Sequence, residues 1–131
     1  MQPLYLKNIR GKGRGVFCKQ LIKKDELIET APLLIIPVGQ KEQVTQSKLV
    51  DYFFTYHDAG ETMSLALGFG SLYNHAEKCN ALYQIDYDNK TINFFALIDI
   101  PANAEICINY AGEYGKSFSD WFTSRNIPYQ K

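Results

Sequence analysis

The sequence has few cysteines, no surplus charge of either sign and no long hydrophobic run. Its three cysteines are an odd number without a C-x-x-C pair, which argues against a disulfide scaffold or a self-contained zinc cage and is typical of a reducing compartment. Fourteen basic residues balance fourteen acidic ones, so we expect no direct nucleic-acid partner, although a local patch can receive a cationic peptide. No apolar run approaches about 18 residues and no signal-peptide core is present, so we expect a soluble intracellular or cytoplasmic protein without membrane contact.

Aromatic side chains are abundant instead, with nine tyrosines and eight phenylalanines beside a single tryptophan. Tyrosine brings a large apolar surface and a hydroxyl, which suits a binding channel as well as a core. The 131 residues carry no linker or low-complexity segment, so we expect one domain over residues 1–131.

Strand-type patterns dominate the chain and predict a mostly β fold of short strands with little helix. Two segments have the same plan, strand, turn and strand, and they cover residues 15–37 and 91–110. Asp25 and Asn103 tolerate a positive φ and stand where each segment must turn, so we expect two hairpins. Residues 40–49 have the spacing of a short exposed helix, and residues 51–60 alternate, which places Tyr52, Phe54 and Tyr56 on one side of an extended segment.

The stretch "NHAEKCN" at residues 74–80 joins His75 and Cys79 between two apolar runs. Taken alone, it is compatible with a metal site, a cysteine nucleophile, a structural turn or a cofactor clamp. Two ligands do not make a zinc site, and a cysteine nucleophile needs an activating base and an orienting group. The glycines of "GKGRGVF" at residues 11–17 let a backbone approach a ligand closely, but no helix follows, so they do not form the dinucleotide fingerprint.

Three stretches taken in order resemble the SET-domain family of protein-lysine methyltransferases. "GKGRGVF" with "LIKKDELIE" resembles the first motif of the family, "LYNHAEKCNA" its Asn-His-Ser-x-x-Pro-Asn motif, and "ALIDIPANAEICINY" the stretch that ends in its Glu-Leu-Thr-x-Asp-Tyr motif. The likeness covers about residues 5–115 and is greatest to short stand-alone SET proteins of bacteria and viruses, which lack pre- and post-SET zinc modules. The implied architecture is a β-clip-like fold of small sheets with a C-terminal pseudoknot near residues 74–80.

The sequence departs from the family pattern at four motif positions. Ala76 replaces the usual Ser, Cys79 the usual Pro, Cys107 the Thr and Asn109 the common Asp. No Cys-x-Cys cluster follows Tyr110, so another segment must close the cofactor pocket. The tail at residues 116–131 is the candidate lid, through Trp121 and Phe122.

The resemblance also implies roles for individual residues. Tyr110 would be catalytic, with its hydroxyl beside the transferring methyl group, and Tyr52, Phe54 and Tyr56 are the candidates for walls of the lysine channel. No metal is implied. The cofactor S-adenosylmethionine would be bound by Gly13, Arg14, Gly15, Asn74, His75, Tyr110 and Trp121.

The expected function is therefore S-adenosylmethionine-dependent methylation of a lysine in a histone or another basic protein. The alternatives are a SET-fold module that binds cofactor or peptide without turnover, to which Ala76 and Cys79 point, and an unrelated β-rich interaction domain. A homodimer is compatible with so small a catalytic domain, and action in the nucleus or in a host cell is compatible with the sequence.

Overall fold

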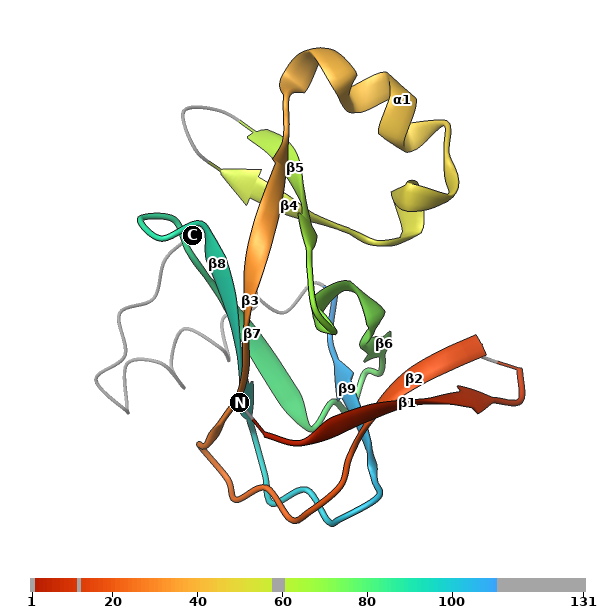
Figure 1. The fold of residues 1–131 in the computed structure, drawn as a ribbon, viewed down its shortest axis with the longest axis vertical. Helices are drawn as coiled ribbons and strands as arrows, with labels where there is room; N and C mark the ends of the chain where they lie inside the picture. The colour runs from red at the N-terminus through yellow and green to blue at the C-terminus, as the bar shows by residue number, and fades with distance from the viewer. Residues whose placement is uncertain (1, 12, 58–60, 111–131) are drawn as a thin grey trace.

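The protein is built mainly from two small β-sheets. The computed structural model describes residues 2–11, 13–57 and 61–110, without the side chain of Glu61, so Trp121, Phe122 and the proposed lid lie outside the described residues. The strands are β1 (Leu4–Ile9), β2 (Gly13–Cys18), β3 (Leu27–Ile36), β4 (Phe53–His57), β5 (Glu61–Ala66), β6 (Asn74–His75), β7 (Ala81–Asp86), β8 (Thr91–Ala96) and β9 (Glu105–Ile108). One sheet has the order β1-β2-β9-β6 and the other β4-β5-β3-β8-β7 (Figure 1). The predicted fold class, mostly β in small sheets, is confirmed.

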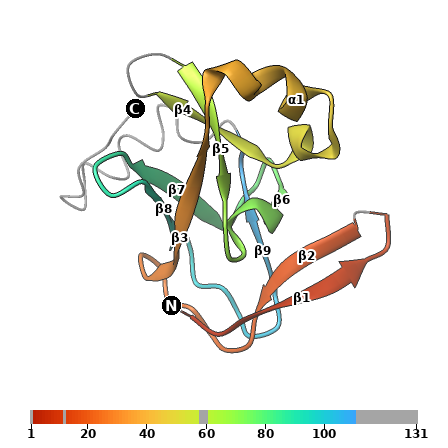
Figure 2. The ribbon, with the colours of Figure 1, turned by 45° about the horizontal axis from the view of Figure 1, so that its top comes forward.

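Helical structure is confined to short pieces. The predicted helix is present as α1 (Lys41–Thr45), flanked by the 3₁₀ turns η1 (Val38–Gln40) and η2 (Lys48–Asp51), with a third, η3 (Gly70–Leu72), before β6. Figure 2 shows α1 at one end of the molecule and the β1–β2 hairpin projecting at the other. Within the described ranges, no helix is long and apolar enough to cross a membrane.

The two strand–turn–strand segments do turn where the sequence predicts. Asp25 and Asn103 have φ values of 74° and 67° at these turns. The expected hairpins, however, are wrong, because β2 and β3 belong to different sheets and so do β8 and β9. The two segments instead pair with each other: β2 lies antiparallel to β9, β3 lies antiparallel to β8, and Ile22 bridges to Ile100 between them.

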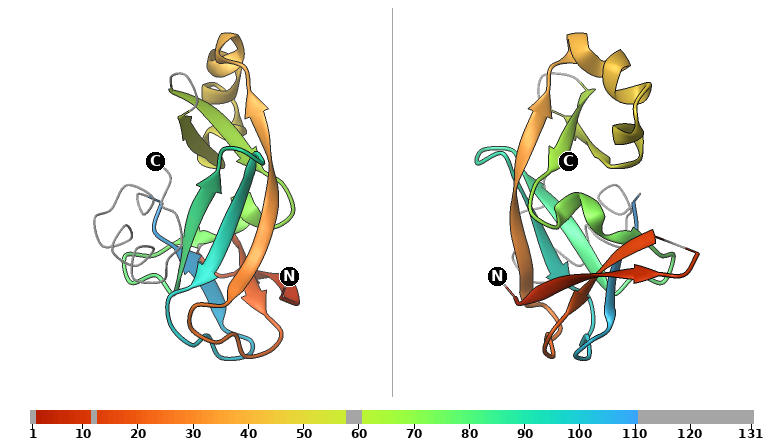
Figure 3. Two further views of the ribbon diagram at one scale, coloured as in Figure 1. Left: turned by 90° about the vertical axis from the view of Figure 1, so that its left-hand side faces the viewer. Right: turned by 45° about the vertical axis from the view of Figure 1, so that its right-hand side comes forward.

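Strand β8 pairs with β7 and shows alternating burial, which places one of its faces against the core. In β8 the side chains of Ile92, Phe94 and Ala96 are fully buried, while the intervening residues are partly exposed. Burying an Ile or Phe side chain stabilises the fold by roughly 1.5–3 kcal/mol. Lys90 takes a φ of 54° in the turn between β7 and β8. Figure 3 shows β3, β7 and β8 side by side, and their inward faces supply much of the core.

The loop between β6 and β7 is bound to β9 at both of its ends. Asn74 and His75 pair in parallel with Cys107 and Ile108. The side chain of Asn80 then forms two hydrogen bonds with the backbone of β9, as a paired strand residue would. Its Nδ2 donates to the Glu105 carbonyl at 2.8 Å, and its Oδ1 accepts from the Cys107 N–H at 2.9 Å. The polar turn between two apolar runs is thus satisfied by the backbone of β9. Threading of the C-terminal segment through this loop, the pseudoknot, stays a prediction.

Candidate active site

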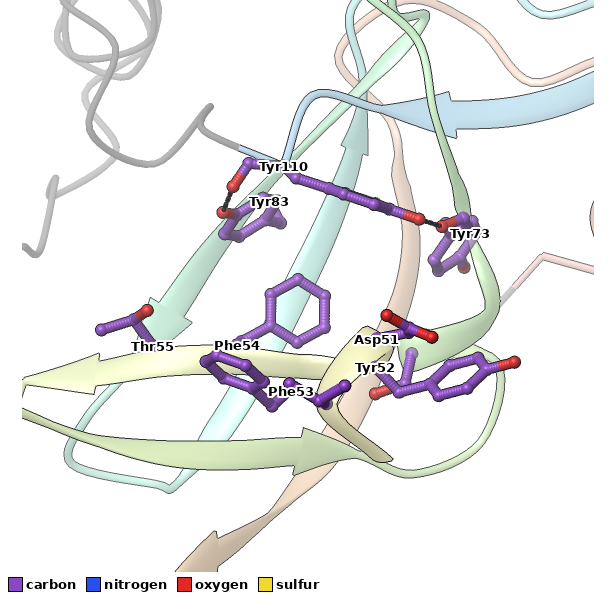
Figure 4. A pocket seen from close by; sticks show the side chains of 10 residues that line it. Asp51, Tyr52, Phe53, Phe54, Thr55, Tyr73, Tyr83 and Tyr110 are labelled. Atoms are coloured by element: carbon purple, nitrogen blue, oxygen red, sulfur yellow. Dashed lines mark hydrogen bonds between the residues drawn. The ribbon is translucent and has the colours of Figure 1, made fainter. Parts of the chain in front are cut away.

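A pocket of about 370 Å³ opens beside the end of β9. Its walls are mostly aromatic and come from segments far apart in the chain (Figure 4). The lining residues are Val50, Asp51, Tyr52, Phe53, Phe54, Thr55, Ser71, Tyr73, Tyr83 and Tyr110.

Two of the three predicted channel residues line this pocket. Tyr52 and Phe54 are part of its wall, where Phe54 packs edge-on against Tyr83 with ring centroids 5.1 Å apart. Tyr56 is not among the lining residues: it is 1% exposed, its ring packs at a tilt against Tyr87, and its hydroxyl donates to the Tyr87 carbonyl at 3.4 Å. It therefore packs in the core, although it shares a face of β4 with Phe54.

Tyr110 follows β9 and is held at three points. Its backbone N–H donates to Nδ1 of His75 at 3.1 Å, and its carbonyl accepts from the Tyr83 hydroxyl at 2.9 Å. Its own hydroxyl donates to the Tyr73 carbonyl at 2.8 Å. Figure 4 shows the Tyr110 side chain extended between Tyr83 and Tyr73. The residue that the sequence motif singled out thus has a defined orientation along the pocket wall.

The Tyr110 hydroxyl keeps its proton at neutral pH. Tyr110 is about half exposed; its partial burial raises its pKa, and the negative charges that Cys107 and Tyr52 carry when ionised raise the pKa further. The group can therefore donate one hydrogen bond to Tyr73 while its oxygen lone pairs stay available to a ligand in the pocket.

His75 contacts Tyr110 rather than the pocket lumen. Because Nδ1 accepts the Tyr110 N–H, that nitrogen carries no proton in this arrangement, and the ring lies 5.0 Å from the Tyr110 ring between centroids. The imidazole therefore connects β6 to Tyr110, two residues beyond the end of β9.

Asn74 meets the glycine-rich strand β2. Its Nδ2 donates to Oε2 of Glu105 at 2.7 Å and to the Arg14 carbonyl at 3.2 Å. A Cβ on Gly15 would come within 2.5 Å of Glu105 Oε2, 2.6 Å of Ile9 Cδ1 and 3.1 Å of Asn74 Nδ2, so a side chain here would displace these groups. Gly13 takes a φ of 83° with open space around the position of a Cβ. Asn74 Oδ1 accepts no hydrogen bond within the described part of the chain, which leaves it available to a ligand amine.

Two observations bear on the cysteine-nucleophile and metal-site interpretations of this stretch. Burial raises the pKa of the Cys79 thiol, which disfavours the thiolate that a cysteine nucleophile needs. Among the residues that the structure describes, no group of three or more His, Cys, Asp or Glu side chains is placed to bind a metal.

Sequence reasoning missed two tyrosines of the pocket. Tyr73 precedes the Asn-His pair and Tyr83 lies on β7, and both bind Tyr110. Tyr83 lies in a strand whose residues 81–85 are all buried, and no local pattern tells a core tyrosine from a pocket tyrosine. For Tyr73 the sequence offers no signal.

Comparison with known proteins agrees with this geometry. The SET-domain family model matches residues 13–111. The chain is 34% identical over 108 residues to the histone-lysine N-methyltransferase, H3 lysine-37 specific, of Schizosaccharomyces pombe, which covers 82% of this chain and 73% of the relative. A solved structure of a candidate histone methyltransferase from Plasmodium falciparum superposes with a TM-score of 0.68 at 29% identity, over 91% of this chain and 98% of that one.

A more distant neighbour shares the fold. It is the chain of ctPRC2, solved in an autoinhibited conformation bound to S-adenosylmethionine, with a TM-score of 0.69 and 20% identity over 95% of this chain and 17% of that one. The family match covers well over half of the sequence, and the motifs that predicted it lie where the site is built. The chain belongs to the SET-domain family.

Proposed function

We propose that the protein is an S-adenosylmethionine-dependent protein-lysine N-methyltransferase that acts on a histone or another basic protein. One observation carries the proposal: Tyr110 joins the aromatic pocket to the Asn74–His75 strand, with its hydroxyl fixed on one side and its backbone on the other. Membership of the SET family and the similarity to a histone-lysine methyltransferase support this reaction.

The residues around β2 and β6 fit the cofactor. When bound, S-adenosylmethionine supplies an electrophilic methyl group on a positively charged sulfur. Asn74 Oδ1 is the unused acceptor that an α-ammonium group requires, and the absence of a side chain at Gly15 allows β2 to lie directly against Asn74. Gly13, Arg14 and the backbone of His75 complete the proposed binding set, and Trp121 remains its proposed lid.

The pocket must bind a lysine and also favour its neutral amine. A free lysine has a pKa near 10.4, so forming the neutral amine at pH 7 costs roughly 4–5 kcal/mol. Aromatic walls such as Tyr52, Phe54 and Tyr83 attract the ammonium by cation–π contact but disfavour its charge by desolvation. Among the described residues, the one carboxylate in the pocket lining is Asp51, which is exposed to solvent, and no His or Glu lines the pocket, so the proton leaves to water before the amine attacks.

Tyr110 orients the reaction. Because its hydroxyl hydrogen is committed to the Tyr73 carbonyl, its oxygen presents lone pairs toward the pocket. These lone pairs can hold the attacking amine in line and stabilise the partial positive charge of the moving methyl group.

A basic peptide is the substrate class that the pocket favours. Asp51 lies in the pocket lining and is exposed, so it can attract a lysine-rich segment. The alternative function is a SET-fold module that binds cofactor or peptide without turnover, since Ala76 and Cys79 depart from the family motif.

One experiment separates the two functions. The purified protein is incubated with labelled S-adenosylmethionine and core histones, and methylated lysines are located by mass spectrometry. Transfer supports the methyltransferase. No transfer by a folded protein that binds S-adenosylhomocysteine in calorimetry would favour the binding module, and no binding at all would contradict both.

Assembly and location follow the same proposal. A histone substrate would place the protein where chromatin is accessible, inside a cell or its nucleus. Homodimerisation stays a prediction, which light scattering coupled to size-exclusion chromatography tests directly.

A further inference from the structure

Glu29 is a carboxylate buried behind the pocket, with 2% of its surface exposed. Both of its oxygens are hydrogen-bonded: Oε1 accepts from the Tyr73 hydroxyl at 2.7 Å, and Oε2 accepts from the Phe69 N–H at 3.0 Å. Within the described ranges these two partners are uncharged groups. Burying a carboxylate without a cation is costly, so a fold that keeps one there needs a reason beyond core packing.

The backbone is shaped to place this side chain. Strand β3 has a register shift between Leu27 and Glu29 where it pairs with β8, and Ile28 and Glu29 are both buried in succession. Such a bulge re-aims a side chain toward the interior. On the other side, Gly68 takes a φ of 60°, and a Cβ there would come within 2.6 Å of Glu29 Oε2. Two independent backbone features therefore make room for one carboxylate.

Tyr73 connects this carboxylate to the catalytic tyrosine. It is 1% exposed, its ring packs on Phe94 at 4.5 Å between centroids, and its hydroxyl is held by Glu29. Its carbonyl accepts the Tyr110 hydroxyl hydrogen at 2.8 Å. Burial, the nearby charge of Glu29 and the hydrogen bond to it all raise the pKa of Tyr73, which keeps its hydroxyl a donor.

We infer that Glu29 is a positioning residue for methyl transfer: it fixes Tyr73, and through the Tyr73 carbonyl it fixes the direction of the Tyr110 hydroxyl. This inference rests on the proposed function. Loss of the Glu29–Tyr73 bond lets the Tyr73 backbone shift. The Tyr110 hydroxyl that is bonded to this backbone then takes the wrong position relative to the reacting amine. Glu29 itself touches neither the pocket nor the proposed cofactor residues.

The test compares Glu29→Gln, Tyr73→Phe and the double variant with the wild type. Tyr73→Phe keeps the ring and the carbonyl and removes only the hydroxyl bonded to Glu29. We expect each single variant to lower kcat about tenfold, with the affinity for S-adenosylhomocysteine unchanged within about twofold. The double variant should be no slower than the slower single one, because Glu29→Gln replaces the charged acceptor of the same hydrogen bond that Tyr73→Phe deletes.

Ile85→Val is the matched stability control. Ile85 is a fully buried residue of β7 outside the pocket lining. Its substitution by Val removes one methylene group, which lowers Tm but leaves the Glu29–Tyr73 bond in place. We expect this variant to keep the wild-type kcat at a temperature where all variants are folded. Should Glu29→Gln fail to fold, Tyr73→Phe alone decides.

The inference would be overturned if Tyr73→Phe kept the wild-type kcat, or if the double variant lost kcat by the product of the two single losses. Glu29 would then be a structural residue. Both outcomes leave the proposed function intact, since the wild type still transfers methyl groups. An inactive, folded wild type would overturn the proposed function and this inference together.

Discussion

The Tyr110 hydroxyl donates a 2.8 Å hydrogen bond to the Tyr73 carbonyl, the residue directly before the Asn-His pair. The Tyr110 N–H in turn donates to Nδ1 of His75, the second residue of that pair. Tyr110 therefore joins its own motif to the Asn-His motif through the two residues on either side of Asn74. This connection places the proposed catalytic hydroxyl and the proposed cofactor residue in one rigid unit.

Removing the Tyr110 hydroxyl should abolish most of the catalysis and leave binding intact. We expect Tyr110→Phe to lower kcat by about 100-fold, by analogy with the loss of one oriented polar group from an active site. S-adenosylhomocysteine affinity should change little, because the bond to His75 uses the backbone N–H. Steady-state kinetics and calorimetry measure the two effects.

Tyr5→Phe is the control for this change. Tyr5 lies on β1, and its hydroxyl donates to Asn103 at the surface, away from the pocket lining. It should retain the wild-type rate. A Tyr110→Phe protein with full activity would remove Tyr110 from the reaction.

A side chain at Gly15 should weaken cofactor binding. The added methyl of Gly15→Ala would meet Glu105 Oε2 at 2.5 Å and Asn74 Nδ2 at 3.1 Å, so the Asn74 amide must move. We expect S-adenosylhomocysteine affinity to fall at least about tenfold, which corresponds to ~1.4 kcal/mol. Gly39→Ala, where a Cβ meets nothing within 4 Å, should bind normally. Equal affinities in the two variants would show that Asn74 does not contact the cofactor.

Asn80 should be needed for stability more than its partial exposure suggests. Asn80→Ala removes both side-chain bonds to β9 and leaves the Cys107 N–H without its acceptor. We expect the free energy of unfolding to fall by about 2–4 kcal/mol in urea titrations. Asn8→Ala, an exposed change on β1, should stay within about 0.5 kcal/mol of the wild type. A small effect at Asn80 would mean that the loop reaches β9 by its backbone alone.

Alkaline pH should increase the rate without an inhibitory ionisation of Tyr110. The pKa of Tyr110 is raised by burial, so the hydroxyl stays protonated while the substrate lysine loses its proton. We therefore expect kcat/KM to rise steadily between about pH 7 and 9.5. A falling limb in this window, with unchanged circular dichroism, would contradict the neutral hydroxyl.

The same tyrosines set the sign of the stability change at high pH. Tyr73 and Tyr110 have raised pKa values in the native state, so above about pH 10 the unfolded chain releases protons that the native chain retains. Their contribution is fully present below that pH and is lost as pH rises beyond it. Urea midpoints should fall from about pH 10 upward, and Tyr73→Phe should fall less steeply.

Local sequence determined the turns, most strand positions and the family. Asp25 and Asn103 stand at turns that need a positive φ, and period-two burial marks β8, because both properties depend on a few neighbouring residues. The three motifs placed Asn74 and Tyr110 in one site, and the family match confirms the SET prediction. The strand β1 and the partners of each strand were beyond such reasoning.

Only the tertiary structure decided which tyrosines line the pocket and that Glu29 is buried behind it. Tyr56 and Phe54 share one strand face and are both buried, yet only Phe54 also lines the pocket. The inward turn of Glu29 needs the bulge that arises when β3 pairs with β8, and its partner Tyr73 lies 44 residues away. Sequence periodicity encodes which side of an element is apolar. The contacts that orient a catalytic hydroxyl are made between elements, and pairing across the fold sets them.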